Sequence, residues 1–150
     1  MIGKLNYLLP TYMHATKLLT AKLHKVLTTS ARAAIGHYCL YKSVSYMLDK
    51  CKWLPLDKMI LNSSLNVLHN VFTNHEPKAI LSLFKLNRRS VAKINTKYIP
   101  KNRELKNFYI YKSIKTYNKL SNDIKGLNKS RFKTKIKSLF RNNQIPDTYD

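Results

Sequence analysis

Apolar residues recur at helical spacing along much of this chain, and that periodicity constrains its fold more than any other feature. The pattern is clearest near the C-terminus, where apolar side chains stand at positions i, i+4, i+7 and i+8: Phe132, Ile136, Leu139 and Phe140. Ser130 is placed to cap this helix. Glycine is scarce, at 3 of 150 residues, whereas β-rich folds with many tight turns need more of it. We therefore predict a mainly α protein, a small bundle of about five helices.

A second amphipathic pattern covers residues 16–35. At about 100° per residue, one face of this helix collects apolar side chains: Leu19, Leu23, Val26, Leu27 and Ala34. The opposite face carries basic side chains: Lys22, Lys25 and Arg32. Gly36 follows as the predicted C-terminal cap.

Three further helices complete the predicted bundle. A short helix follows the cap Ser43, with its inward residues Val44, Met47 and Leu48. The next begins at Pro55, a favoured first helical residue, and runs to about residue 72. Its apolar face is formed by Ile60, Ser64, Val67, Leu68, Val71 and Phe72. Another helix covers residues 107–120, with a broad apolar side: Tyr109, Ile114, Tyr117 and Leu120.

Between residues 85 and 106 the periodicity fades, and Pro100 interrupts any regular element. We interpret this segment as a basic, irregular connector, with a strand around residues 91–94 as its candidate element. The connector separates an N-terminal helical part, residues 1–84, from a C-terminal helical pair, residues 107–143. Residues 144–150 form a tail that we expect to be frayed.

The chain is strongly basic, with 28 Lys and Arg against 7 Asp and Glu and a formal net charge of +21. Such an excess costs self-repulsion in the folded state, so an anionic partner is expected. Nucleic acid is the usual polyanion, and an anionic membrane surface is the next. An AT-rich coding sequence is an alternative source of the many lysines. Residues 76–150 hold 19 basic and 5 acidic groups, so we expect the contacts there.

Eleven basic residues are the candidate contacts with nucleic acid. Three lie in the connector: Arg88, Arg89 and Lys93. The others lie on the two C-terminal helices: Lys112, Lys115, Lys119, Arg131, Lys133, Lys135, Lys137 and Arg141. Aromatic side chains among lysines can also stack on bases. We assign Tyr109 and Tyr117 to the core because they follow helical spacing. Both roles stay open for Phe108 and Tyr111.

No residue pattern indicates catalysis or a cofactor. The acids stand singly, so they offer no carboxylate cluster for a two-metal centre, and the glycines are too far apart for a phosphate-binding loop. His37, Cys39 and Cys51 lack the paired spacing of a zinc site, and we interpret the cysteines as small buried side chains. The other histidines fit helix surfaces or turns: His14, His24, His69 and His75. We therefore expect neither an enzyme nor a bound metal.

Two cysteines make no disulfide framework, which favours a reducing intracellular compartment, the nucleus or the cytoplasm. No apolar run approaches the roughly 18 residues of a membrane span. Pro10 interrupts the first apolar stretch, so a secretory signal peptide is not indicated. The acid-free N-terminal region is similar to a mitochondrial transit peptide, but arginine is nearly absent there, and we expect no mitochondrial targeting.

Four stretches stand in a recognisable order. Residues 113–125 read Ser-Ile-Lys-Thr-Tyr-Asn-Lys-Leu-Ser-Asn-Asp-Ile-Lys, and Phe132-Lys133 with its basic helix follows. Residues 51–56 read Cys-Lys-Trp-Leu-Pro-Leu, residues 31–34 read Ala-Arg-Ala-Ala, and residues 4–10 read Lys-Leu-Asn-Tyr-Leu-Leu-Pro. In this order they resemble the C-terminal region of LINE-type, jockey-like non-LTR retrotransposon reverse transcriptases. The departures from the family pattern are Tyr117 for Trp, Ser121 for Pro, His24 for Gln and Ser30 for Asn.

The resemblance implies the thumb and post-palm region of such an enzyme, with residues 1–84 thumb-like. The metal-binding Asp-Asp motif of that family lies upstream, in the palm, so no catalytic residue carries over to this chain. In the parent enzyme this region would help to hold template RNA and the primer duplex. The expected function is a non-catalytic module that binds RNA or DNA without sequence specificity. The alternatives are a structural or interaction subunit that binds a protein partner through its apolar helix faces, a vestigial retroelement fragment, and membrane-surface binding.

Overall fold

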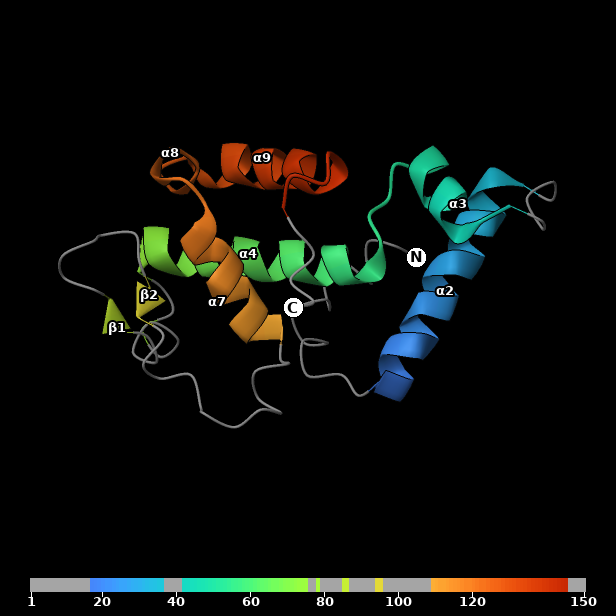
Figure 1. Ribbon diagram of the computed structural model, residues 1–150, viewed down its shortest axis with the longest axis horizontal. Coiled ribbons are helices and arrows are strands. Elements are labelled where there is room, and N and C mark those ends of the chain that lie inside the picture. Colours follow the sequence, from blue (N-terminus) through green and yellow to red (C-terminus); the bar gives the residue numbers. More distant parts are fainter. Residues whose placement is uncertain are drawn as a thin grey trace. The chain divides into compact units, whose positions relative to one another are not determined.

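The computed structural model describes residues 17–36, 42–75, 78, 85–86, 94–95 and 109–145 (Figure 1). The helices in this part of the chain are α2 (Lys17–Ile35), α3 (Val44–Lys50), α4 (Leu56–Asn74), α7 (Tyr109–Lys119), α8 (Asn122–Lys125) and α9 (Lys129–Arg141). Two strands of two residues each, β1 (Lys85–Leu86) and β2 (Ile94–Asn95), accompany them. The prediction of a mainly α helical bundle is confirmed. The chain forms two compact units, Met1–Ile60 and Leu61–Asp150.

The core of the first unit lies between α2 and α3. Leu27 and Ala31 of α2 are buried, as are Met47 and Leu48 of α3. The Cys51 Sγ approaches the Ala31 carbonyl oxygen at 3.8 Å, which places the end of α3 against the C-terminal part of α2. The burial of Met47 and Leu48 confirms two of the three inward residues predicted for this short helix, whereas Val44 is half-buried.

The predicted apolar face of α2 is only partly right. Leu27 is buried, but Leu19 and Val26 are 39% and 42% exposed, and Ala34 is exposed as well. The reason is that α3 packs on the side of α2 that carries Leu27 and Ala31, and this partner decides which side becomes the core.

Backbone caps set the ends of α2, α3 and α4. Gly36 has φ +96° and donates its N–H to the Arg32 carbonyl at 3.1 Å, which confirms it as the C-terminal cap of α2. The Ser43 Oγ accepts from the Tyr46 N–H at 3.3 Å, as predicted for α3. Pro55 was expected to be the first residue of α4, but the helix begins one residue later. The Pro55 carbonyl accepts from the Met59 N–H at 2.9 Å, so proline is the N-cap.

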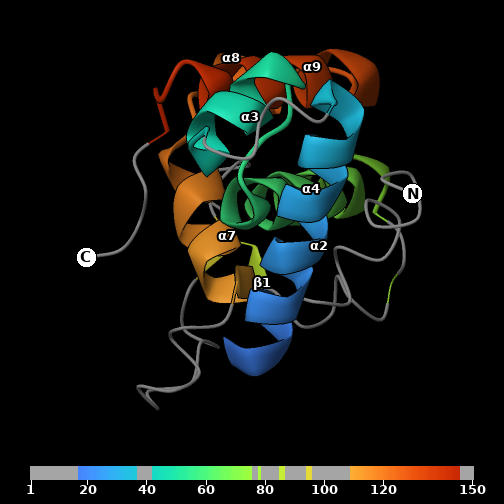
Figure 2. The same ribbon diagram turned by 90° about the vertical axis from the view of Figure 1, so that its right-hand side faces the viewer.

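The second unit is built from the rest of α4 with α7, α8 and α9. In two perpendicular views α9 lies along α4, and α7 crosses it (Figures 1 and 2). Three of these helices contribute large side chains to one core: Leu65, Leu68 and Val71 from α4, Ile114 and Tyr117 from α7, and Phe132, Ile136 and Phe140 from α9. Helix α4 thus shares a core with the C-terminal helices, although the predicted connector, residues 85–106, separates them in the sequence.

His69 of α4 lies inside this core, and the expectation of a helix-surface or turn residue is wrong for it. Its side chain is 1% exposed, and its ring stacks on Phe132 of α9, with ring centroids 3.8 Å apart and planes 4° apart. The position lies four residues after Leu65 on the buried stripe of α4. His24 and His75 are exposed, as expected, and His14 lies outside the described residues.

The two ends of α9 differ from prediction in one respect. The N-cap is Asn128, whose Oδ1 accepts from the Arg131 N–H at 2.9 Å, and Ser130 is already inside the helix. At the other end Asn143 has φ 51°, and the Gln144 N–H donates to the Leu139 carbonyl at 3.0 Å. This is a Schellman ending with asparagine in the left-handed position. Ile145, just beyond it, is 7% exposed and closes the core.

The strands β1 and β2 pair antiparallel, with Lys85 opposite Asn95 and Leu86 opposite Ile94. They lie within the predicted connector, and Ile94 belongs to the strand expected around residues 91–94. The other residues of the connector and the tail after Ile145 lie outside the part of the chain that the structure describes.

Candidate nucleic-acid interface

The orientation of α9 follows from three buried side chains. Phe132, Ile136 and Phe140 stand four residues apart, and each is 2% exposed or less. With that side of the helix held in the core, the remaining sides face solvent. The predicted basic residues of α9 are all exposed, and Lys129 joins them: Lys129, Arg131, Lys133, Lys135, Lys137 and Arg141.

These cations form two rows along α9. One row is formed by cations at four-residue steps, which rise about 6 Å each along the helix axis: Lys129, Lys133, Lys137 and Arg141. Arg131 and Lys135 form a second row on the other flank. Small hydroxyl residues separate the rows: Ser130, Thr134 and Ser138. A rigid helix therefore presents regularly spaced ammonium and guanidinium groups, an arrangement that suits a polyanion.

Two hydroxyls of this middle row, those of Thr134 and Ser138, are engaged within α9. Thr134 Oγ1 donates to the Ser130 carbonyl at 3.2 Å, and Ser138 Oγ donates to the Lys135 carbonyl at 2.7 Å. Because their protons are used on the backbone, these side chains leave the direct contacts with an anion to the basic rows beside them.

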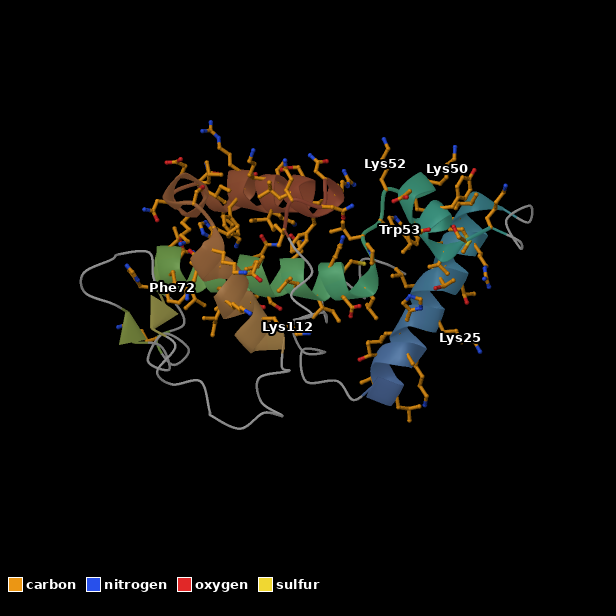
Figure 3. All side chains as sticks on the ribbon, in the orientation of Figure 1. Lys25, Lys50, Lys52, Trp53, Phe72 and Lys112 are labelled. Atoms are coloured by element: carbon orange, nitrogen blue, oxygen red, sulfur yellow. The ribbon has the colours of Figure 1, made fainter. Side chains whose placement is uncertain are left out.

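Helix α7 gathers its lysines on one side. Lys115 and Lys119 are exposed and Lys112 is half-buried. Lys112 is labelled on this helix in Figure 3. At helical spacing the three lie within an arc of about 60°. Ile114 and Tyr117, each 4% exposed, occupy the other side and hold it in the core. The structure thus brings the three predicted lysines of α7 together.

The exposed basic residues of α7 and α9 are named here the basic surface: Lys115, Lys119, Lys129, Arg131, Lys133, Lys135, Lys137 and Arg141. Residues 109–145 contain ten Lys and Arg and one acidic residue, Asp123. Lys129 and Arg131 lie in the first turn of α9, at the positive end of the helix dipole. This turn holds no acidic residue that could offset their charge. This charge distribution opposes folding and favours a bound anion.

Lys125 of α8 is a further cation that the sequence did not single out. Its Nζ donates to the Asn118 carbonyl at 3.2 Å and lies 5.7 Å from the centre of the Tyr117 ring. These contacts fix the side chain against the end of α7. No periodicity could have shown this residue, because α8 has only four residues.

The aromatic side chains of α7 and α9 belong to the core wherever the structure describes them. Tyr117 is 4% exposed, which confirms its assignment, and burial raises the pKa of its phenol. Phe132 and Phe140 are buried as well. The described part of the basic surface therefore offers cations and no stacking platform. Other predicted positions lie outside the described residues or side chains: Arg88, Arg89, Lys93, Phe108, Tyr109 and Tyr111.

The described residues hold no group of three His, Cys, Asp or Glu that could ligate a metal ion. Cys51 is a half-buried free thiol rather than a fully buried one, and Cys39 lies outside the described part. None of the described helices combines the length and the apolar character that crossing a bilayer requires.

Comparisons with known proteins identified no relative of this chain. No family model, no curated protein and no solved structure matches this chain. The similarity to retrotransposon reverse transcriptases therefore rests on the sequence motifs alone.

Proposed function

We propose that this protein is a non-catalytic nucleic-acid-binding module that contacts phosphates through the basic surface. The observation that carries the proposal is the row of buried side chains that fixes the orientation of α9 beneath that surface. Phe132, Ile136 and Phe140 hold α9 in one orientation, so its cations project from a fixed helix. A segment with ten basic residues and a single acid needs an anion to offset its self-repulsion.

Binding of this kind follows from charge. Each Lys or Arg that neutralises a phosphate releases condensed counterions, so affinity falls steeply as salt rises. A surface that makes about 6–10 phosphate contacts loses roughly 10³–10⁵-fold in affinity between about 50 and 200 mM salt. Phosphate contacts carry no direct sequence information, so the module binds RNA or DNA without sequence preference. The resemblance to a region that holds template and primer supports the same function.

Filter binding across a salt series, with single-stranded RNA, duplex DNA and an RNA–DNA hybrid, tests the proposal. The decisive variant replaces Lys133, Lys135 and Lys137 with glutamine. It should lower the slope of log affinity against log salt on duplex DNA by up to about 2.7, because each lost contact removes about 0.9.

A matched control makes the same charge change on another element. Lys22, Lys25 and Arg32 of α2 are exposed, and glutamine at these three positions should leave the slope near that of the wild type. Equal losses in the two triple variants would show that only total charge matters. Affinity that does not change with salt would overturn the proposal.

The exposed apolar side chains of α2 favour a second function, an interaction subunit of a nucleoprotein assembly. Leu18 is 69% exposed, and Leu19 and Val26 add to the same helix surface. Exposed apolar patches mark sites of protein association. Sedimentation over a concentration series, alone and with nucleic acid, tests this function, and a monomer under both conditions would count against it.

A further inference from the structure

An exposed tyrosine on α3 lies between two lysines. Tyr46 is 41% exposed, whereas the described aromatic residues of α7 and α9 are buried. The Nζ of Lys42 is 5.6 Å from the centre of the Tyr46 ring, and the Nζ of Lys50 is 5.9 Å from it. The basic surface lacks such an arrangement in its described part, so this cluster is a chemically different place on the protein.

The local structure holds the cluster together. Met47 and Leu48 are buried, so α3 is anchored by one side, and Tyr46 projects from another. The Tyr46 N–H donates to Ser43 Oγ, which fixes the backbone at the start of the helix. Lys50 stands four residues after Tyr46 on α3, the spacing at which side chains meet on a helix. Lys42 precedes the cap Ser43, and its Nζ reaches the ring from outside the helix.

The charge around the ring is positive. Lys50 extends away from α3 and Lys52 from the turn that follows it (Figure 3). Asp49 is the acid on α3, so Lys42, Lys50 and Lys52 outnumber it. A tyrosine ring can stack on any base, and ammonium groups beside it can meet the phosphates on either side of that base. Cation contacts with an exposed ring are weak, so the lysines can leave it when a base arrives.

We propose that Lys42, Tyr46 and Lys50 form a stacking site for one unpaired nucleotide of a single-stranded nucleic acid. The site deepens the proposed function and rests on it, because it adds base contact to phosphate contact. Tyr46 stacks on the base, while Lys42 and Lys50 neutralise the neighbouring phosphates. Stacking and phosphate contact do not distinguish one base from another, so binding at this site is sequence-tolerant.

The test compares two oligomers of equal length and charge, oligothymidylate and the same backbone with abasic sugars, on the full chain. Stacking of one base should make the thymidylate bind about 5- to 150-fold more tightly. Tyr46→Leu should abolish this preference and leave abasic affinity unchanged. Tyr46→Phe keeps the ring and should retain the preference. Circular dichroism checks that each variant is folded.

The lysines have a separate readout. Lys42→Gln and Lys50→Gln should each lower the salt slope by about 0.7 on both oligomers, because the contact is to phosphate. Equal binding of the two oligomers by the wild type, or a preference that survives in Tyr46→Leu, would overturn the stacking site. If binding to both oligomers is independent of salt, the proposed function fails instead. Salt-dependent binding without base preference leaves that function standing and rejects this site.

Discussion

At the scale of single residues, His69 stands out because it is a titratable side chain buried in an apolar core. Its ring is packed flat on Phe132, and its Nε2 lies 3.4 Å from the Thr73 hydroxyl. Burial lowers the pKa of this imidazole below its ordinary value of 6.5. The Leu127 backbone lies near enough to offset part of the shift, although no partner meets hydrogen-bond geometry at Nδ1. The folded state therefore favours the neutral form of His69 more than the unfolded state does.

Stability should then depend on pH in a defined direction. Above the unfolded pKa of 6.5 both states are neutral, and the contribution of His69 is fully present. Below it the unfolded chain takes up the proton first, so the free energy of unfolding falls as pH falls toward the folded pKa. Denaturant titrations between about pH 7.5 and about pH 5.5 should show this loss.

Two substitutions isolate the histidine in those titrations. His69→Phe keeps a ring for stacking and removes the titrating group, so the loss between the two pH values should shrink. His24→Phe, at an exposed position of α2, should keep the wild-type pH dependence. An equal loss in His69→Phe would place the titrating group elsewhere.

At the scale of elements, α9 shows what periodicity can and cannot predict. The spacing of Phe132, Ile136 and Phe140 predicted its buried side and its exposed cations. An apolar residue at every turn fixes which side of a helix faces the core, and the polar residues must then face solvent. Its start could not be predicted from the same spacing. Asn128 and Ser130 are both good cap residues, and either start leaves the apolar stripe in place.

Other elements depend on tertiary contacts that the sequence does not display. The core side of α2 is decided by α3, so Leu19 and Val26 were misplaced. The four residues of α8 are too few to show a period, and Lys125 was missed with them. His69 was missed because histidine has no strong preference for core or surface, although its place on the stripe of α4 was a usable signal.

The cap of α9 gives a direct test. Asn128→Ala removes the acceptor of the Arg131 N–H and should lower the free energy of unfolding by about 1 kcal/mol. Ser130→Ala, at the residue that was expected to be the cap, should change it by no more than about 0.5 kcal/mol. Urea titrations of both variants measure the difference, and the reverse order would contradict the assignment of the cap.

A charge reversal in the first turn of α9 should raise the stability of the protein and lower its affinity for nucleic acid. Lys129→Glu places a carboxylate at the positive end of the helix dipole and should stabilise the protein by about 0.3–1 kcal/mol at low ionic strength. The same change removes a cation from the basic surface and should weaken nucleic-acid binding. Lys137→Glu is the matched control, because it changes the same charge away from that turn. It should weaken binding with a smaller gain in stability, from reduced self-repulsion alone, and equal gains in the two variants would point to total charge instead.

At the scale of the whole molecule, the net charge of +21 acts on every part of the chain at once. Like charges raise the free energy of the compact state, and salt relieves this repulsion as the screening length falls from about 30 Å at 0.01 M to about 10 Å at 0.1 M. A bound polyanion relieves it too, but through contacts that salt weakens. Salt and nucleic acid should therefore stabilise the protein separately and compete when combined.

Thermal unfolding measures this competition. Without nucleic acid, the melting temperature should rise as sodium chloride is increased between about 0.01 and 0.1 M. At the lowest salt, nucleic acid at about 100 times its dissociation constant should add about 2.7 kcal/mol of stability. At higher salt the same nucleic acid concentration should add little, because the dissociation constant has risen. Dextran, an uncharged polymer, is the control for crowding and should have a small effect at every salt concentration. A melting temperature that falls with salt in the free protein would mean that ion pairs, not self-repulsion, dominate its electrostatics.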